Sequence, residues 1–339
     1  MFAIKEYTEI NSVSGNEGRI RKRILDDIKP YADDIKVDSM GNIIAFKKGT
    51  SDSSKKIILA AHMDEVGFIV SDITEDGFVK FKEVGGIDPR ILLAQRVVIG
   101  DNNISGVMGI KAVHLQSPEE RKSVIKLKDM YIDIGAKSKE EAEKLVNKGD
   151  YVAFDSDYKE FGDNIIKAKA LDDRAGCAVM TQLIKESYDA DIYFCFTVQE
   201  VTGTRGAMIA SRAIGADVAI ILEGTTCSDT AGVKEHEHAT SFGSGPVLSL
   251  MDYGSYSDMD LNRFIINLAK ENDLKFQFKR TINGGNDARA FQTASVPCKT
   301  AAISVPCRYI HSPVSCANKD DIEKTYELVF CVMKNIHKF

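Results

Sequence analysis

Ionisable side chains follow several apolar segments of this 339-residue chain. Two imidazoles together with several carboxylates form a ligand chemistry suited to zinc, cobalt or manganese. A divalent ion of this kind can polarise a carbonyl and lower the pKa of bound water, so the pattern favours metal-assisted hydrolysis. The residues that carry the pattern are His62 and Asp64, Asp172 and Asp173, Glu200, Glu223, and His311.

Separate roles can be assigned within this set. Hydrolysis of an amide needs a carboxylate that takes a proton from water and returns it to the leaving amine, and Glu200 is our candidate for that general base. Asp172 suits a position between two metals, which a carboxylate can bridge. Asp64 lies two residues after His62, where it can orient the imidazole through its second nitrogen.

Each residue also has a plain structural interpretation. A lone histidine on an apolar strand is more often a hydrogen-bonded core residue than a ligand. Asp172 and Asp173 could cap the helix that follows them, and Glu223 could pair with an arginine. Taken singly these alternatives are favoured, but polar residues that end separate strands together favour a site.

The segments before these residues predict an α/β fold. Residues 191–198, DIYFCFTV, form an apolar, β-branched and aromatic run, which is typical of a strand buried on both faces. The turn after it contains Gly203 and Gly206, and a helical segment follows. Ligands bind at the carboxyl ends of such strands, so Glu200 is placed at a binding edge. Near the start, Ser14 and Glu17 have capping-box spacing for a helix.

The pattern changes to short alternating strands separated by Gly and Asn turns after about residue 68. This pattern is typical of a small barrel or sandwich. We therefore expect an inserted all-β, barrel-like domain at 68–162, within an α/β domain formed by 1–67 and 163–339. The α/β domain should contain a mixed sheet flanked by helices.

Composition excludes several classes of partner. The formal net charge is −6, and no basic run is interleaved with aromatics, so nucleic acid is not expected. No apolar stretch is long enough to span a membrane, and the N-terminal segment carries charges that do not fit a signal peptide. The seven cysteines are irregularly spaced with no CxxC pair, which indicates a reduced, cytoplasmic protein.

Ordered motifs along nearly the whole chain resemble one family, the glutamyl and tetrahedral aminopeptidases. These are co-catalytic metallopeptidases, and some members are labelled endoglucanases. The resemblance implies a peptide substrate, one or two divalent ions (zinc or cobalt), a β domain that mediates dimerisation, and assembly of dimers into a hollow dodecamer. The motifs are SVSGNEG, DSMGNIIA, AHMDEVGF, VGGIDPRIL, GVMGIKAVHL, ALDDRAG, TVQEVTGTRGA, GGNDARAFQ and RYIHSPV.

The resemblance also assigns residues by position. His62 would bind one metal with Glu223, and His311 would bind a second metal. Asp172 would bridge the two metals, and the Asp172–Asp173 peptide would be cis. Two positions depart from the family pattern. The family has two adjacent glutamates where this chain has Glu200-Val201, and it has Asp where this chain has Glu223.

Three functions are compatible with these residues. The first is a metal-dependent aminopeptidase that releases N-terminal residues, with Glu200 as general base. The second is a metal-depleted, catalytically weak paralogue that serves as an assembly or peptide-binding subunit, because Val201 cannot ligate a metal. Glycan hydrolysis ranks last. It needs paired carboxylates, but nothing in the sequence indicates a second carboxylate to pair with Glu200, and the chain has no Trp to stack on a sugar.

Overall fold

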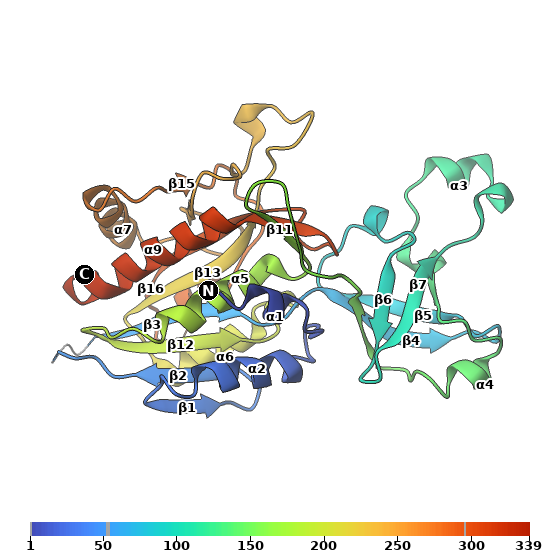
Figure 1. Ribbon diagram of the computed structural model, residues 1–339, viewed down its shortest axis with the longest axis horizontal. Coiled ribbons are helices and arrows are strands. Elements are labelled where there is room, and N and C mark those ends of the chain that lie inside the picture. Colours follow the sequence, from blue (N-terminus) through green and yellow to red (C-terminus); the bar gives the residue numbers. More distant parts are fainter. Residues whose placement is uncertain (1, 52–54, 295) are drawn as a thin grey trace.

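A mixed β-sheet forms the centre of the computed structural model, which describes residues 2–51, 55–294 and 296–339 (Figure 1). The strand order is β1-β2-β12-β3-β13-β16-β17-β11-β10, with β14 beside β16 and β15 beside β14. The inner strands β12, β3, β13 and β16 are parallel. The strands are β1 (Asp34–Val37), β2 (Ile43–Lys47), β3 (Lys56–His62), β10 (Lys159–Phe161), β11 (Ile165–Ala168), β12 (Asp191–Thr197), β13 (Val218–Thr226), β14 (Val247–Ser249), β15 (Gln277–Phe278), β16 (Lys299–Arg308) and β17 (Ser315–Asn318).

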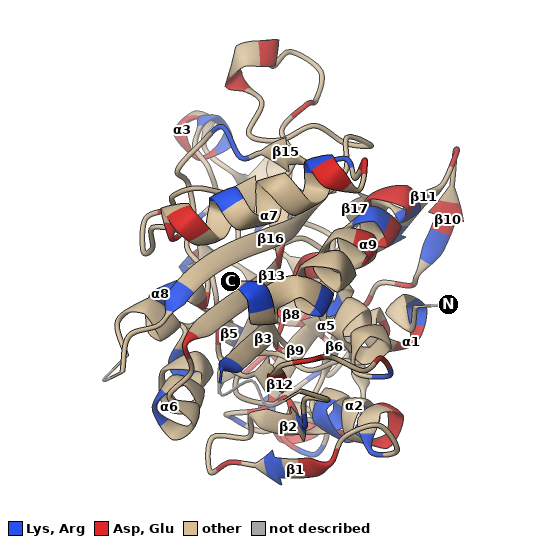
Figure 2. Cartoon of the chain, turned by 90° about the vertical axis from the view of Figure 1, so that its left-hand side faces the viewer, with Lys and Arg blue, Asp and Glu red and all other residues tan. Residues whose placement is uncertain are grey.

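Helices cover both faces of this sheet, which explains the continuous apolar strands. Along β3, Ile57 and Leu59 belong to one core cluster and Ile58 and Ala60 to another, as strand alternation requires. Figure 2 shows α1, α2, α5 and α9 on one side and α6 and α8 on the other. The helices are α1 (Ile4–Thr8), α2 (Gly18–Ile28), α5 (Leu171–Leu183), α6 (Arg205–Ile214), α7 (Met259–Glu271), α8 (Ala288–Gln292) and α9 (Lys319–Asn335).

A closed barrel of order β4-β5-β8-β7-β6-β9 lies beside the sheet (Figure 1). Phe68 is at its centre, with ring centroids 5.0 Å from Phe81 and 5.5 Å from Phe154. The predicted fold class is confirmed, while the division into domains at 67/68 and 162/163 stays a prediction. The elements are β4 (Gly67–Ile73), β5 (Val79–Val84), β6 (Arg96–Ile99), β7 (Ile104–Gly109), β8 (Tyr131–Asp133), β9 (Tyr151–Phe154), α3 (Pro118–Lys122) and α4 (Lys139–Ala142).

One local prediction near the N-terminus was wrong. Ser14 and Glu17 do not form a capping box, because α2 begins at Gly18 and no side chain caps it. The Ser14 hydroxyl lies 3.1 Å from that of Thr202, and Glu17 accepts the N–H of Gln199. Both residues thus contact a segment far away in the sequence. In the described part of the chain, every helix is too short or too polar to span a bilayer.

Candidate active site

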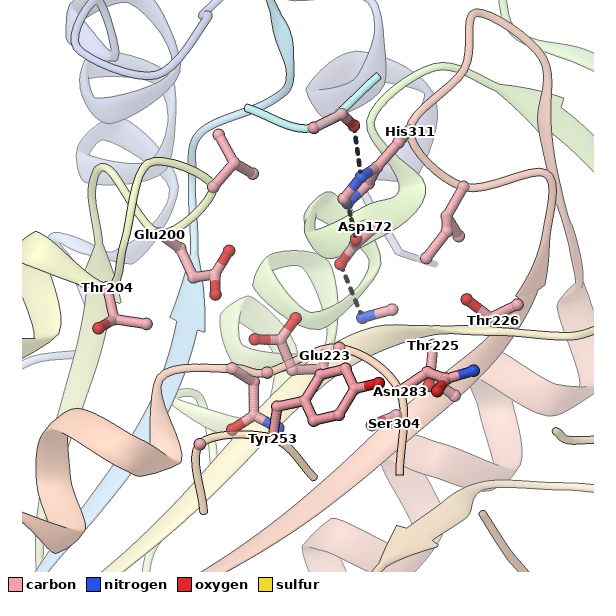
Figure 3. A pocket seen from close by; sticks show the side chains of 18 of the residues that line it. Asp172, Glu200, Thr204, Glu223, Thr225, Thr226, Tyr253, Asn283, Ser304 and His311 are labelled. Carbon is pink, nitrogen blue, oxygen red and sulfur yellow. Dashed lines mark hydrogen bonds and ion pairs between the residues drawn. The ribbon is translucent and has the colours of Figure 1, made fainter. Parts of the chain in front are cut away.

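The register of the parallel strands brings the predicted site residues together. His62 ends β3 and pairs with Thr197, three residues before Glu200. On the other side, Ala60 pairs with Ile221, so Glu223 lies level with His62. Glu223 lies within β13 rather than at its end, because that strand continues to Thr226. Figure 3 shows Asp172, Glu200 and Glu223 facing the same space.

Carboxylates surround the buried imidazole of His62. Its Nε2 lies 3.5 Å from Asp172 Oδ1, 3.5 Å from Glu223 Oε2 and 3.9 Å from Glu200 Oε2. On the other side of the ring, Nδ1 lies 3.0 Å from the backbone oxygen of Asp64 and 3.4 Å from its carboxylate. The backbone oxygen of Asp64 is therefore the nearer acceptor for a proton on Nδ1, and that tautomer leaves Nε2 free to ligate.

His62, Asp172 and Glu223 form a compact donor group, whose ligand atoms all lie within 4.8 Å of one another. Burial alone would lower the pKa of His62, but Glu223, Asp172 and Asp64 raise it well above its usual value. Burial raises the pKa of Glu223 well above its usual value. Burial and the charge of Glu223 together raise the pKa of Glu200 well above its usual value. A site that stabilises positive charge and offers one imidazole and two carboxylates fits a divalent metal.

The other predicted ligand, His311, contacts the opposite oxygen of Asp172. Its Nε2 lies 3.3 Å from Asp172 Oδ2, and its Nδ1 lies 2.8 Å from the carbonyl oxygen of Gly86 (Figure 3). Val201 lines the same pocket but packs against the core of the barrel. Among the described residues, the compact donor group comprises His62, Asp172 and Glu223 and does not include His311. In that part of the chain, no third His, Cys, Asp or Glu side chain joins His311 and Asp172 in such a group.

Side-chain acceptors hold the backbone of the Glu200 loop. The consecutive N–H groups of residues 198 to 201 donate in turn to Asn42 Oδ1 (3.0 Å), Glu17 Oε1 (3.1 Å), Asp64 Oδ1 (3.0 Å) and Asp64 Oδ2 (3.1 Å). Our sequence reasoning assigned Asp64 only to His62 and missed Glu17 and Asn42. The motifs SVSGNEG and DSMGN contain them, but nothing local in the sequence indicates their partners.

A buried ionic network fixes the two segments that carry His62 and Asp172. Lys169 Nζ lies 2.7 and 2.6 Å from the two carboxylate oxygens of Glu65. Arg174 donates to the carbonyl oxygen of Met63 at 2.6 Å and to that of Tyr7 at 2.6 Å. Lys169, Glu65 and Arg174 are at most 2% exposed, so the network is shielded from bulk solvent and its geometry is tightly determined. Sequence reasoning assigned no role to these residues.

The site opens into a pocket of about 1200 Å³. The carboxylates of Asp172, Glu200 and Glu223 line it together with Ser249, Ser304 and Lys279. The pocket is large enough to admit the end of a peptide chain.

Comparison with known proteins defines the class as a hydrolase of the peptidase type. A relative from Acetivibrio thermocellus is 40% identical over 328 residues, 96% of each chain. The lysyl aminopeptidase of Pyrococcus furiosus is 31% identical over 341 residues, 98% of this chain and 96% of its own. The TET1 peptidase of Pyrococcus horikoshii, which can assemble into a tetrahedron or a large octahedral shell, superposes with a TM-score of 0.86 at 35% identity, covering 97% and 98% of the two chains.

The family follows from the same comparison. The model of the M42 glutamyl aminopeptidases matches residues 41–328, and the chain belongs to that family. The resemblance carried by the sequence motifs is thereby confirmed. The cis peptide expected between Asp172 and Asp173 is also present.

Proposed function

We propose that this chain is a metal-dependent aminopeptidase in which Glu200 is the general base. The observation that supports this most is the position of Glu200. Its carboxylate lies 3.9 Å from His62 Nε2, beside the His62–Asp172–Glu223 group but not part of it. A carboxylate that lines the pocket without being a metal ligand is free to accept and donate a proton.

The His62–Asp172–Glu223 group would hold one divalent ion, zinc or cobalt. When bound, such an ion supplies Lewis-acid polarisation of the scissile carbonyl and lowers the pKa of a bound water. Glu200 accepts the proton of the attacking water at its carboxylate and delivers it to the leaving amine. Asp64 orients His62 and, through its two carboxylate oxygens, fixes the backbone of Glu200 and Val201.

A second ion, held by His311 and Asp172, would be bound more weakly. Val201 supplies no donor atom there, and even the loss of an outer-shell partner lowers metal affinity by about 10 to 100-fold. Val201 is also the observation that favours the alternative function. In that case the chain is a metal-depleted paralogue that serves as an assembly or peptide-binding subunit.

We also propose that the chain forms a homo-oligomer, a dimer or a dodecamer built from dimers. The similarity to the TET1 peptidase of Pyrococcus horikoshii, which forms closed shells, supports this proposal. In this proposal residues 68–162, which contain the closed barrel, form the inserted domain through which two chains pair. Residues 1–67 and 163–339 form the peptidase domain.

Metal content and turnover, measured on one sample, test the function. The protein is purified without chelator and supplied with zinc, cobalt or manganese. Metal per chain is then measured by mass spectrometry, and aminoacyl-nitroanilide hydrolysis is followed on the same material. We expect at least one ion per chain and turnover that a chelator abolishes. No bound metal and no turnover with any of these ions would refute the proposed aminopeptidase function and would favour the metal-depleted paralogue.

A further inference from the structure

The barrel contributes a turn to the wall of the active-site pocket. Its strand β5 ends at Val84, and the chain continues through Gly85 and Gly86. Val84 pairs with Gly67, the first residue of β4, and β4 begins shortly after His62 at the end of β3. This register brings the turn after β5 beside the segment that leaves His62, and Gly86 lines the pocket.

The turn is closely enclosed at Gly85. The φ angle of this residue is +83°, in the left-handed region that favours glycine. A Cβ atom there would lie 2.8 Å from Cγ1 of Val66 and 3.1 Å from Cγ2 of Val201. Carbon atoms in favourable contact are about 3.5–4.0 Å apart, so both distances are too short. Only glycine therefore lets the turn pack against Val66 and against the residue that follows Glu200.

The next residue of the turn, Gly86, contacts His311. Its carbonyl oxygen lies 2.8 Å from His311 Nδ1 (Figure 3). A carbonyl oxygen can only accept a hydrogen bond, so Nδ1 must carry the proton. In the neutral ring this leaves Nε2 unprotonated, and Nε2 lies 3.3 Å from Asp172 Oδ2. A histidine that ligates a metal through one nitrogen commonly donates the other N–H to such an acceptor.

Packing alone does not fix the imidazole of His311. The side chain is 38% exposed, so its ring is enclosed on only part of its surface. The backbone is left-handed at Tyr309 (φ +59°) and at His311 (φ +57°), which is uncommon for residues other than glycine. Such conformations persist where the surroundings hold them. Ser312 holds the backbone by donating to the carbonyl oxygen of Tyr309 at 2.6 Å, whereas the hydrogen bond to Gly86 orients the ring.

We propose that Gly86 is a positioning residue of the active site, whose carbonyl oxygen holds His311 in the tautomer that presents Nε2 as a ligand. Gly85 allows the turn to approach closely enough for this contact. The barrel then has a role in the site itself, in addition to the chain pairing proposed above. His62 has a comparable acceptor in the carbonyl of Asp64, two residues away, whereas the acceptor of His311 comes from the barrel. The inference rests on the proposed function, because it assumes that His311 binds the second divalent ion.

The first test compares cobalt binding to Gly85→Ala and to a matched control, Gly77→Ala. Gly77 precedes β5, lies outside the pocket lining, has φ +84°, and its Cβ would lie 2.9 Å from the carbonyl oxygen of Ala136. Both substitutions thus strain the barrel. In calorimetric titrations extended to millimolar cobalt, Gly85→Ala should weaken the second ion by about 10 to 100-fold and the first by less than about 3-fold, the effect expected from loss of an outer-shell partner. Gly77→Ala should leave both affinities at the wild-type level.

Three results of the titration would overturn the inference while leaving an aminopeptidase with one ion intact. These are equal weakening of both ions in Gly85→Ala, the same second-ion affinity in the two variants, or a wild type that takes up a single ion at millimolar cobalt. Wild-type protein that binds no metal and hydrolyses no aminoacyl-nitroanilide would instead refute the proposed function.

A second test uses metal-free protein and requires neither bound ion nor turnover. Long-range proton–nitrogen NMR spectra distinguish a proton on Nδ1 from one on Nε2 in a neutral imidazole, and the signals of His311 are identified by their loss in His311→Gln. We expect the Nδ1–H tautomer in the wild type and in Gly77→Ala, and a mixture of tautomers in Gly85→Ala. An Nε2–H tautomer in the wild type would overturn the inference even if Gly85→Ala does not fold, and so would an unchanged tautomer in folded Gly85→Ala.

Discussion

Replacing Asp64 by Asn should weaken both the fold and the metal site. Asp64 is fully buried, and its two oxygens accept the N–H groups of Glu200 at 3.0 Å and Val201 at 3.1 Å. Asparagine has the same shape but one acceptor oxygen, so its NH₂ group must face one of these donors. The buried N–H that loses its acceptor costs about 1–3 kcal/mol.

This free-energy cost corresponds to a measurable fall in the melting temperature. A chain of 339 residues has an unfolding entropy of about 0.7 kcal/mol/K. The Tm of the metal-free protein should therefore fall by about 1–4 °C. Asp64 also contacts His62 Nδ1, both through its backbone oxygen and through its carboxylate at 3.4 Å. Loss of this supporting charge should weaken metal binding by about 10 to 100-fold.

The assay combines thermal unfolding of chelator-treated protein with zinc affinity measured by competition against a chromogenic chelator. Asp321→Asn is a matched control, because Asp321 is also buried and accepts the N–H groups of Gly243 and Gly245, each at 2.7 Å. It does not line the pocket, so this variant should lose stability but keep its zinc affinity. Wild-type zinc affinity in Asp64→Asn would refute the assigned role of Asp64.

Three further changes test other parts of the site and fold. Glu200→Gln should abolish aminoacyl-nitroanilide turnover with Tm and metal content unchanged, because the amide cannot accept the proton of water; unaltered turnover would remove Glu200 from the mechanism. Val201→Glu should add one metal site per chain in a calorimetric titration by supplying His311 and Asp172 with a carboxylate; an equal number of sites in both proteins would contradict this. Burial raises the pKa of Asp229, but the Arg308 guanidinium, with Nε 2.9 Å away, lowers it to about 2. A lowered pKa stabilises the fold above the unfolded value of about 3.9 and loses that effect as the pH falls toward 2. Asp229→Asn should thus unfold in urea with about 1 kcal/mol less stability than wild type from pH 5 to 8, and the difference should shrink below pH 4; a constant difference would exclude ionisation as its cause.

The central strands and their polar ends could be predicted from the sequence, because both depend on short-range patterns. Residues 191–198 and the segment before His62 are apolar along their length, which is typical of parallel strands covered on both faces. Parallel strands carry their carboxyl ends to one edge of a sheet. Those two facts were enough to predict that His62, Glu200 and Glu223 lie close together. They did not predict the distances between the side chains.

The supports of these residues could not be predicted, because they depend on contacts between remote segments. The acceptor for the N–H of Gln199 is Glu17, 182 residues away, and the acceptor for that of Val198 is Asn42, 156 residues away. Glu17 also has capping-box spacing from Ser14, and that local pattern led to a wrong prediction. In the folded chain the N–H of Ser14 donates to the carbonyl oxygen of Glu65, and Glu17 accepts the N–H groups of Gly15 and Gln199 instead.

The way the Glu200 loop is held bears directly on the choice between an active peptidase and an inactive paralogue. Asn42, Glu17 and Asp64 hold this loop by accepting the backbone N–H groups of residues 198 to 201, and none of these hydrogen bonds uses the side chain at 201. A valine in place of a glutamate at that position therefore removes a metal donor without releasing the loop. The position of Glu200 and the presence of a second metal ligand are separable properties of this fold. For that reason Val201 argues for a site with one firmly held ion more strongly than it argues for loss of the general base.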